Sequence, residues 1–280
     1  MFIFRTIADL QAHLYKLKET QKEIGFVPTM GALHEGHISL LAALQQNRQI
    51  SVCSIFVNPT QFNNATDLEK YPRTVEDDIA QLTHACCDIL FLPSVEEMYP
   101  AGMQRSVDHE FGELETVLDG AHRPGHFQGV AQVVARLLDI VAPDTLYLGQ
   151  KDYQQCAIIS KLVKDKNIAI DIEIVATKRE QDGLAMSSRN RRLTEPQRAV
   201  AGVIYQCLVS IQTKQGIQDF SIVKKECLDI LEKKGFKVDY IELADADTLQ
   251  LLDNYKPEST TVALIAAYLG DIRLIDNLLL

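Results

Sequence analysis

Strand-like and helix-like segments alternate along the first 175 residues, and this alternation constrains the fold more than any other feature of the sequence. Short apolar runs are expected to form strands at 24–27, 50–57, 89–92, 145–148 and 170–175. Apolar residues recur with helical spacing at 6–20, 37–46, 74–87, 130–141 and 153–163. Such alternation is typical of a parallel sheet covered by helices on both faces. The sequence therefore predicts an α/β, Rossmann-like fold.

The pattern changes after about residue 176. Two helices are expected at 194–211 and 221–234, and three strands follow at 238–243, 261–268 and 272–275. Gly270 and Asp271 form a turn signal between the last two strands, which indicates an antiparallel hairpin. We therefore expect a Rossmann-like domain over residues 1–176. A smaller α+β C-terminal domain over residues 177–280 would act as a lid, with helices and a small antiparallel sheet.

Composition excludes several classes of protein. The formal net charge of −10 argues against broad nucleic-acid binding, which needs a basic face. No apolar run approaches the roughly 18 residues that a membrane span needs. The six cysteines form no CxxC pair, and the apolar stretch before Arg5 is too short for a signal peptide. We expect a cytoplasmic protein with reduced thiols that binds no nucleic acid and no membrane.

The segment 28–37 reads Pro-Thr-Met-Gly-Ala-Leu-His-Glu-Gly-His, a strand end followed by a turn and a helix start. Helix N-termini bind anions, and a spacing of three places His34 and His37 on one face of a helix. Two imidazole donors at such a position suit a polyphosphate. Metal ligation and a purely structural role are the alternatives. The zinc-protease pattern, however, has its histidines four residues apart, with glutamate after the first.

A second segment, Met-Ser-Ser-Arg-Asn at 186–190, offers hydroxyls and a guanidinium, which also suit phosphates. The first segment resembles the HIGH motif of the nucleotidylyltransferase superfamily, and the second resembles its KMSKS-type loop. Four further blocks lie between these two segments, at 54–62, 71–74, 123–127 and 149–155. Together, the six blocks and their order resemble the pantoate–β-alanine ligase (pantothenate synthetase) family. A lone HxGH-like tetrapeptide would be weak support, whereas six ordered blocks are strong support.

The resemblance implies an ATP-dependent ligase that joins pantoate to β-alanine through pantoyl adenylate and releases AMP and pyrophosphate. It also implies that the domain over residues 1–176 binds nucleotide and pantoate, that Mg²⁺ lies beside the ATP substrate, and that the protein is a homodimer. Two other classes remain open at this point. One is a related nucleotidylyltransferase that leaves a nucleotide on its product. The other is a non-catalytic nucleotide-binding protein.

The resemblance also assigns roles to individual residues. The catalytic residues would be His34, His37, Lys151 and Arg189. Nucleotide contacts would come from Met30, Arg123, Gly149, Asp152, Ser187 and Ser188, with His126 in the same loop as Arg123. Pantoate contacts would come from Gln61, Gln155, Met30 and Phe62. Mg²⁺ contacts would come from Asp77, Asp78 and Gln81.

Local sequence offers a plainer interpretation for most of these residues. Asp77 and Asp78 could simply complement a helix dipole. Lys151 with Asp152, and each glutamine, could be ordinary surface residues. The segment 123–126 could be a turn, and 187–189 a linker between domains.

Overall fold

The computed structural model describes residues 1–63, 65–103, 109–256 and 258–280, and the chain divides into two compact units. The first unit comprises Met1–Gly149 and Ile158–Val175, and the second comprises Gln150–Ala157 and Ala176–Leu280. The sequence pattern predicted 150–157 as part of the first domain, whereas in the structure this segment belongs to the second unit. The reason is long-range contact, because Tyr153 and Gln150 bond to residues of the C-terminal region.

The first unit is built on a six-stranded parallel sheet with the order β1-β4-β3-β2-β5-β6. Its strands are β1 (Phe2–Phe4), β2 (Ile24–Thr29), β3 (Ile50–Ile55), β4 (Ile89–Phe91), β5 (Thr145–Gly149) and β6 (Asp171–Val175). The predicted Rossmann-like sheet is confirmed, although the sequence analysis missed the short strand β1. Because all these strands run the same way, their carboxyl ends meet at one edge, where ligands bind in folds of this kind.

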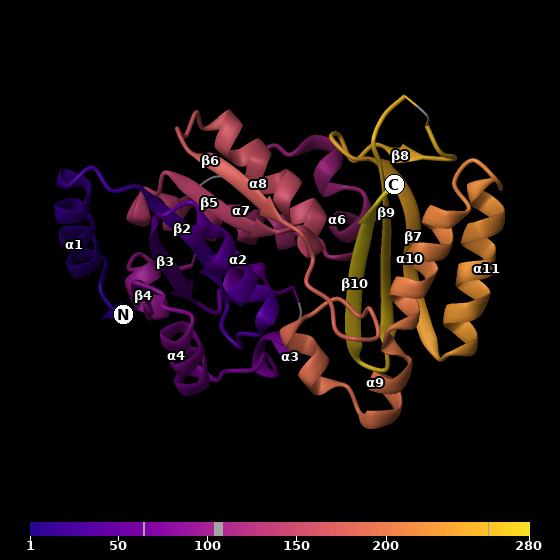
Figure 1. Cartoon of the computed structure of the whole chain (residues 1–280), viewed down its shortest axis with the longest axis horizontal. Helices are drawn as coiled ribbons and strands as arrows, with labels where there is room; N and C mark the ends of the chain where they lie inside the picture. Colours follow the sequence, from indigo (N-terminus) through magenta and orange to yellow (C-terminus); the bar gives the residue numbers. More distant parts are fainter. Residues whose placement is uncertain (64, 104–108, 257) are drawn as a thin grey trace. The chain divides into compact units, whose positions relative to one another are not determined.

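Helices cover both faces of this sheet (Figure 1). The helices along this part of the chain are α1 (Ile7–Glu19), α2 (Glu35–Gln46), α3 (Ala65–Glu69), α4 (Val75–His84), α5 (Val95–Met98), α6 (Leu118–His122), α7 (His126–Val141) and α8 (Tyr153–Asp165). Short 3₁₀ turns lie at η1 (Pro59–Gln61) and η2 (Gly112–Glu115). On one face, Leu41 and Leu44 of α2 and Leu82 of α4 form a buried cluster with Val27 of β2. Alternate residues of each strand therefore face different helices.

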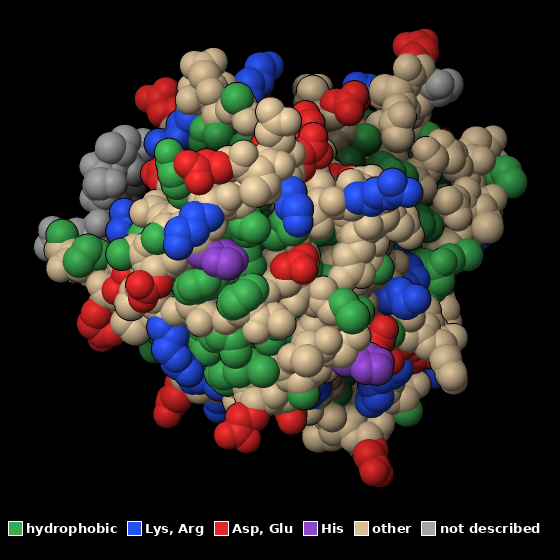
Figure 2. Space-filling view, turned by 60° about the vertical axis from the view of Figure 1, so that its left-hand side comes forward, with side chains coloured by type: hydrophobic (Ala, Val, Ile, Leu, Met, Phe, Trp, Pro, Cys, Tyr) green, Lys and Arg blue, Asp and Glu red, His purple; other side chains and the backbone are tan. Residues whose placement is uncertain are grey.

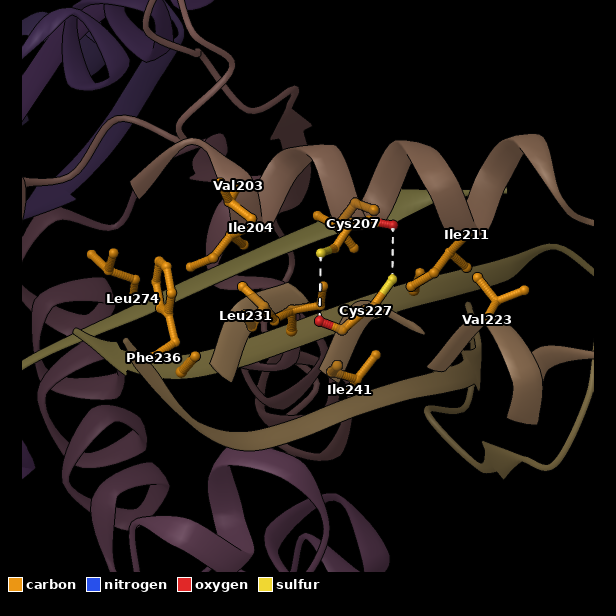
Figure 3. Close-up of a cluster of buried hydrophobic side chains, with 14 of the residues drawn as sticks. Val203, Ile204, Cys207, Ile211, Val223, Cys227, Leu231, Phe236, Ile241 and Leu274 are labelled. Carbon is orange, nitrogen blue, oxygen red and sulfur yellow. Dashed lines mark hydrogen bonds between the residues drawn. The ribbon is translucent and has the colours of Figure 1, made fainter. Parts of the chain in front are cut away.

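The second unit contains a four-stranded antiparallel sheet with the order β10-β9-β7-β8. Its strands are β7 (Phe236–Asp245), β8 (Leu251–Leu252), β9 (Thr261–Leu269) and β10 (Ile272–Leu279). Leu269 pairs with Ile272 across the turn, which confirms the predicted hairpin. Helices α10 (Val203–Thr213) and α11 (Phe220–Lys233) pack on this sheet, and Cys207 and Cys227 face each other within the core (Figure 3). The remaining elements are η3 (Gln150–Asp152), η4 (Ser188–Arg192) and α9 (Glu195–Ala201).

The long helix predicted over 194–211 is wrong, because the structure has two helices that meet at Gly202. Glycine is a poor helix former, and a Cβ atom at this position would lie 2.8 Å from the carbonyl oxygen of Asp182. The close approach of the segment around Asp182 therefore requires glycine here. A periodic apolar pattern does not reveal such a contact.

Surface charge and helix hydrophobicity relate to the expectations about nucleic acid and membranes. On the face shown in Figure 2, Lys and Arg side chains are interspersed with acidic and uncharged ones. That distribution, with the net charge of −10, gives this face no broad basic field. Within the described ranges, no helix is long and apolar enough to cross a membrane.

Candidate functional site

The histidine motif forms the connection between β2 and α2 in the first unit. His34 is the N-cap of α2, with extended φ and ψ of −148° and 172°, and His37 occupies the third helical position. The two imidazole rings lie 4.1 Å apart between centroids. The expected closeness of the pair is therefore confirmed, but its predicted cause is wrong. The histidines meet through a capping box and not by sharing one face of a helix.

Hydrogen bonds fix the orientation of both imidazoles. The Nδ1 atom of His34 accepts from the backbone N–H of Gly36 at 3.1 Å, and the Nδ1 atom of His37 accepts from the N–H of His34 at 3.3 Å. A neutral imidazole whose Nδ1 accepts must carry its proton on Nε2. The helix start thus presents two Nε2–H donors. One of its own backbone N–H groups, that of Gly36, is bonded to an imidazole and does not point toward an anion.

A buried carboxylate supports the loop that leads to these histidines. Asp78 of α4 is 1% exposed, and its two oxygens accept from the N–H groups of Ala32 at 2.9 Å and Leu33 at 2.8 Å. Ala32 has a φ of 50°, which is costly for a residue with a Cβ atom, and these bonds stabilise it. Gly31 has a φ of 77°, and a Cβ there would lie 3.0 Å from the Asp78 carboxylate.

Two neighbours on α4 act on the same loop. The Gln81 side chain donates to the carbonyl oxygen of Leu33 at 3.3 Å. Thr74 is the N-cap residue of α4, but its hydroxyl donates to the Asp78 carboxylate at 3.1 Å and does not cap the helix. Helix α4 ends at His84, three residues earlier than expected. The α4 start therefore fixes the shape of the histidine loop.

The predicted pantoate residues of the first unit also meet. Gln61 in η1 is 8% exposed, and its amide Nε2 lies 2.9 Å from the sulfur of Met30. Asn58 lies at the start of the same turn and donates to the Gln61 side chain at 3.3 Å. The ring of Phe62 packs edge-on against Tyr71, with centroids 5.7 Å apart. An amide thus lies beside a thioether where β2 and β3 end.

A third histidine, His126 of α7, contacts the backbone of Gln61. The Nδ1 atom of His126 lies 2.7 Å from the Gln61 carbonyl oxygen, and a guanidinium nitrogen of Arg123 lies 3.0 Å from Nε2. Because arginine can only donate, Nε2 of His126 accepts and Nδ1–H donates to the carbonyl. His126 is buried and is the first residue of α7, so it is not part of a simple turn. This contact connects Arg123 to the backbone of Gln61.

The block 149–155 carries Lys151, Asp152 and Gln155. Gly149 ends β5 in the first unit, and a Cβ atom added there would meet nothing within 4 Å among the described residues. In the second unit, Lys151 and Asp152 lie in η3, and the Lys151 Nζ atom is 3.3 Å from a carboxylate oxygen of Asp152. Gln155 lies partly exposed in the first turn of α8. Burial raises the pKa of the neighbouring Tyr153 to about 12, and its hydroxyl donates to the Ala246 carbonyl.

The segment 187–189 forms the start of η4, also in the second unit. The Ser187 hydroxyl accepts from the N–H of Arg189 at 3.3 Å, so it caps this turn. Ser188 is buried, while Ser187 and Arg189 are half-buried. An isolated bridge between Arg179 and Ala185 precedes the turn. The segment is therefore an ordered turn, and not the open linker of the plainer interpretation.

The residues expected to hold Mg²⁺ differ in availability. Asp77 is exposed on α4, whereas both oxygens of Asp78 and the amide of Gln81 bind the histidine loop. Across the described residues, no group of three or more His, Cys, Asp or Glu side chains forms a candidate metal site. Of the three predicted residues, Asp77 fits direct metal contact best. The assignment of the set stays a prediction.

Sequence reasoning missed one residue that contacts the site segments. Asn277 of β10 is 2% exposed and bonds to the backbone of η3. The only local signal is a polar pair, Asp276 and Asn277, inside an otherwise apolar strand end. Such a pair breaks the alternation expected of a strand with one buried face.

The fold and the histidine pair at the end of β2 define a nucleotide-binding protein of the Rossmann-like α/β class. The family model described as pantoate–β-alanine ligase matches residues 2–279. A pantothenate synthetase of Pseudomonas fluorescens is 47% identical over 276 residues, which cover 98% of this chain and 96% of that protein. The chain belongs to the pantoate–β-alanine ligase family and is therefore an enzyme that forms a carbon–nitrogen bond.

Two solved structures agree with this assignment. The pantothenate synthetase of Thermus thermophilus is 39% identical, with a TM-score of 0.92 and 99% of each chain covered. The pantoate–β-alanine ligase of Francisella tularensis is 38% identical, with a TM-score of 0.84, covering 100% of this chain and 97% of that one. That enzyme was crystallised with β-γ ATP and β-alanine.

Proposed function

We propose that this chain joins pantoate to β-alanine in two steps that consume ATP. In the first step, a pantoate carboxylate oxygen attacks the α-phosphorus of ATP, forming pantoyl adenylate and releasing pyrophosphate. In the second step, the β-alanine amine attacks the activated carbonyl, the bond to AMP breaks, and the amine loses a proton. The ligands of the Francisella tularensis enzyme support ATP and β-alanine as substrates.

The geometry of the histidine pair carries this proposal. Both Nδ1 atoms accept backbone N–H groups, so His34 and His37 each offer an Nε2–H donor from a fixed ring. Donors that are already oriented stabilise charge growing on a phosphate without further reorganisation, each by about 3 kcal/mol. We assign the pair to the α-phosphate, where negative charge grows during attack.

Two cationic residues are also proposed to contact the phosphates. Lys151 and Arg189 would neutralise the phosphates, and a guanidinium can bind two phosphate oxygens in one plane. Asp152, Ser187 and Ser188 would contact the nucleotide, with Gly149 leaving space for it and Arg123 and Met30 beside it. Mg²⁺, when bound, would supply positive charge to the phosphates, and Asp77 is the residue that would best hold it.

Pantoate would lie against Gln61 and Met30. An amide both donates and accepts, which suits a hydroxy acid, and Gln155 would supply a second amide. Met30 and Phe62 would contact the apolar gem-dimethyl group. The rate then depends mainly on positioning the two reactants, which can lower a barrier by roughly 7–11 kcal/mol. No side chain is required as a nucleophile.

Release of AMP tests this function directly. Purified protein with ATP, Mg²⁺ and pantoate should release AMP continuously only when β-alanine is added. A nucleotidylyltransferase would leave the nucleotide on its product and release no AMP with β-alanine. A non-catalytic binder would bind ATP and form neither AMP nor pyrophosphate. Either result would refute the proposal.

Three further assignments are also proposals. The homodimer rests on the family resemblance alone, and the cytoplasmic location rests on the cysteine pattern of the sequence. The lid role of the C-terminal domain rests on the change in sequence pattern near residue 176. ATP with Mg²⁺ should then slow hydrogen exchange across residues 180–192. Unchanged exchange at saturating ATP would contradict a mobile clamp in this segment.

A further inference from the structure

Asn277 binds the backbone of the segment that carries Lys151. Its Nδ2 atom donates to the carbonyl oxygens of both Gln150 and Lys151, each at 2.9 Å. Its Oδ1 atom accepts from the Gln150 side chain at 3.2 Å. Asn277 is 2% exposed, so water does not replace these bonds when they are lost. One buried amide thus uses both of its N–H groups on η3.

A buried ion pair fixes Asn277 in turn. The Arg179 guanidinium donates to both carboxylate oxygens of Asp276, at 2.6 and 3.1 Å, and to the Asn277 carbonyl at 3.2 Å. The N–H of Asn277 donates to the Asp276 carboxylate at 2.8 Å. The guanidinium also lies 4.0 Å above the ring of Tyr205, so the arginine is held on several sides.

The same arginine reaches the segment before η4. Its Nη1 atom donates to the carbonyl oxygen of Gly183 at 3.1 Å, four residues before Ser187. Both η3 and η4 pack against β10. One polar network on β10 therefore connects the segment of Lys151 to the segment that leads to Arg189.

We propose that Asn277 is a positioning residue that sets the place of Lys151 in the reaction. This inference rests on the proposed function, in which Lys151 contacts the phosphates. The carbonyl oxygens of Gln150 and Lys151 accept hydrogen bonds from Asn277, so they point toward β10. Without these bonds η3 can shift, and a displacement of about 1 Å can cost on the order of 10²-fold in rate.

A double-mutant cycle between Asn277 and Lys151 tests this role. ATP would be titrated by calorimetry into the wild type, Asn277→Ala, Lys151→Ala and the double variant, and AMP formation would be measured in parallel. We expect Asn277→Ala to weaken ATP binding about tenfold and to slow AMP formation about 10- to 100-fold. In the Lys151→Ala background, the same change should alter ATP affinity less than about twofold.

Gln212→Ala is the matched control, because Gln212 donates a side-chain amide to the Leu279 carbonyl on the same strand, away from η3. It should leave ATP affinity unchanged. If Asn277→Ala does not fold, Asn277→Asp replaces it in the cycle, since it keeps the acceptor for Gln150 and removes both donors.

Three results would overturn the inference. An unchanged ATP affinity in the folded Asn277 variant would do so, as would an equal loss with and without Lys151, which indicates a general structural role. Wild-type affinity and turnover in Lys151→Ala would instead refute the proposed role of Lys151, and the inference with it. The AMP-release assay on the wild type separates these results from a failure of the proposed function.

Discussion

The two units fix their site segments with side chains of opposite hydrogen-bonding character. In the first unit, the Asp78 carboxylate accepts from the N–H groups of Ala32 and Leu33. In the second unit, the Asn277 amide donates to the carbonyls of Gln150 and Lys151. In both units, a buried side chain from another element binds two consecutive peptide groups of the segment that bears the proposed catalytic residues.

The difference shows which groups each segment leaves for a ligand. Where Asp78 accepts from two backbone N–H groups, we expect the imidazole side chains to supply the donors for a phosphate. Where Asn277 occupies backbone carbonyls, their partial negative charge is directed away, and the cationic Lys151 remains. The second unit also has a buried ion pair beside its amide: the Asp276 carboxylate, next to Asn277, is paired with the Arg179 guanidinium. The predictions below test these differences.

The largest expected effect comes from Arg179→Leu, which leaves the Asp276 carboxylate buried without its cation. We expect the free energy of unfolding at neutral pH to fall by about 3–5 kcal/mol, measured by urea denaturation. Burial raises the pKa of Asp276, and losing Arg179 removes the main influence that lowers it. The folded variant should therefore bind a proton more readily, so its deficit should shrink at acid pH and grow as the pH rises.

Arg198→Leu is the control for that measurement. Arg198 forms an exposed ion pair with Asp182, and its loss should cost less than about 1 kcal/mol. Equal losses in the two variants would show that burial of the Asp276 pair does not matter.

The next effect concerns the histidine pair. His34→Asn keeps a good N-cap but removes the Nε2–H donor, so stability should change by less than about 0.5 kcal/mol. The rate of AMP formation should fall by about 10²-fold, as for one lost transition-state donor, and His37→Ala should lose a similar factor. Near-normal turnover of either variant at saturating substrates would refute the phosphate-contact assignment.

A smaller effect distinguishes the adjacent carboxylates of α4. Asp78→Asn turns an amide N–H₂ toward a backbone donor in the histidine loop and should cost about 1–3 kcal/mol in stability, with a parallel loss of activity. Asp77→Asn affects an exposed side chain and should cost less than about 1 kcal/mol. We expect Asp77→Asn instead to raise the Mg²⁺ concentration needed for half-maximal rate. Equal stability of the two variants would contradict the role given to Asp78.

Local patterns predicted much of the first unit. Alternating periods located its main strands and helices, and the ends of β2, β3 and β5 located the segments with Met30, Gln61 and Gly149. These features depend on neighbours in sequence, which a single chain displays. The capping of α2 by His34 was harder to predict, because histidine is not among the preferred N-cap residues.

Long-range contacts in the second unit were not predictable in this way. Asn277 lies 127 residues from Gln150 in sequence, and no local pattern specifies which backbone a buried amide will bind. Two helices meet at Gly202, where a Cβ atom would lie 2.8 Å from the Asp182 carbonyl oxygen, and periodicity does not show this contact. Polar residues inside apolar strands are thus the signals to examine when a site is sought from sequence.

The fate of the pantoate carboxylate oxygens tests the central claim, attack at the α-phosphate of ATP, most directly. Pantoate labelled with ¹⁸O in its carboxylate would be converted with ATP and β-alanine, and the products analysed by mass spectrometry. In an adenylate mechanism, one carboxylate oxygen stays on the α-phosphorus when the amine displaces AMP. The account predicts labelled AMP and unlabelled pyrophosphate. Labelled inorganic phosphate formed together with ADP would contradict it.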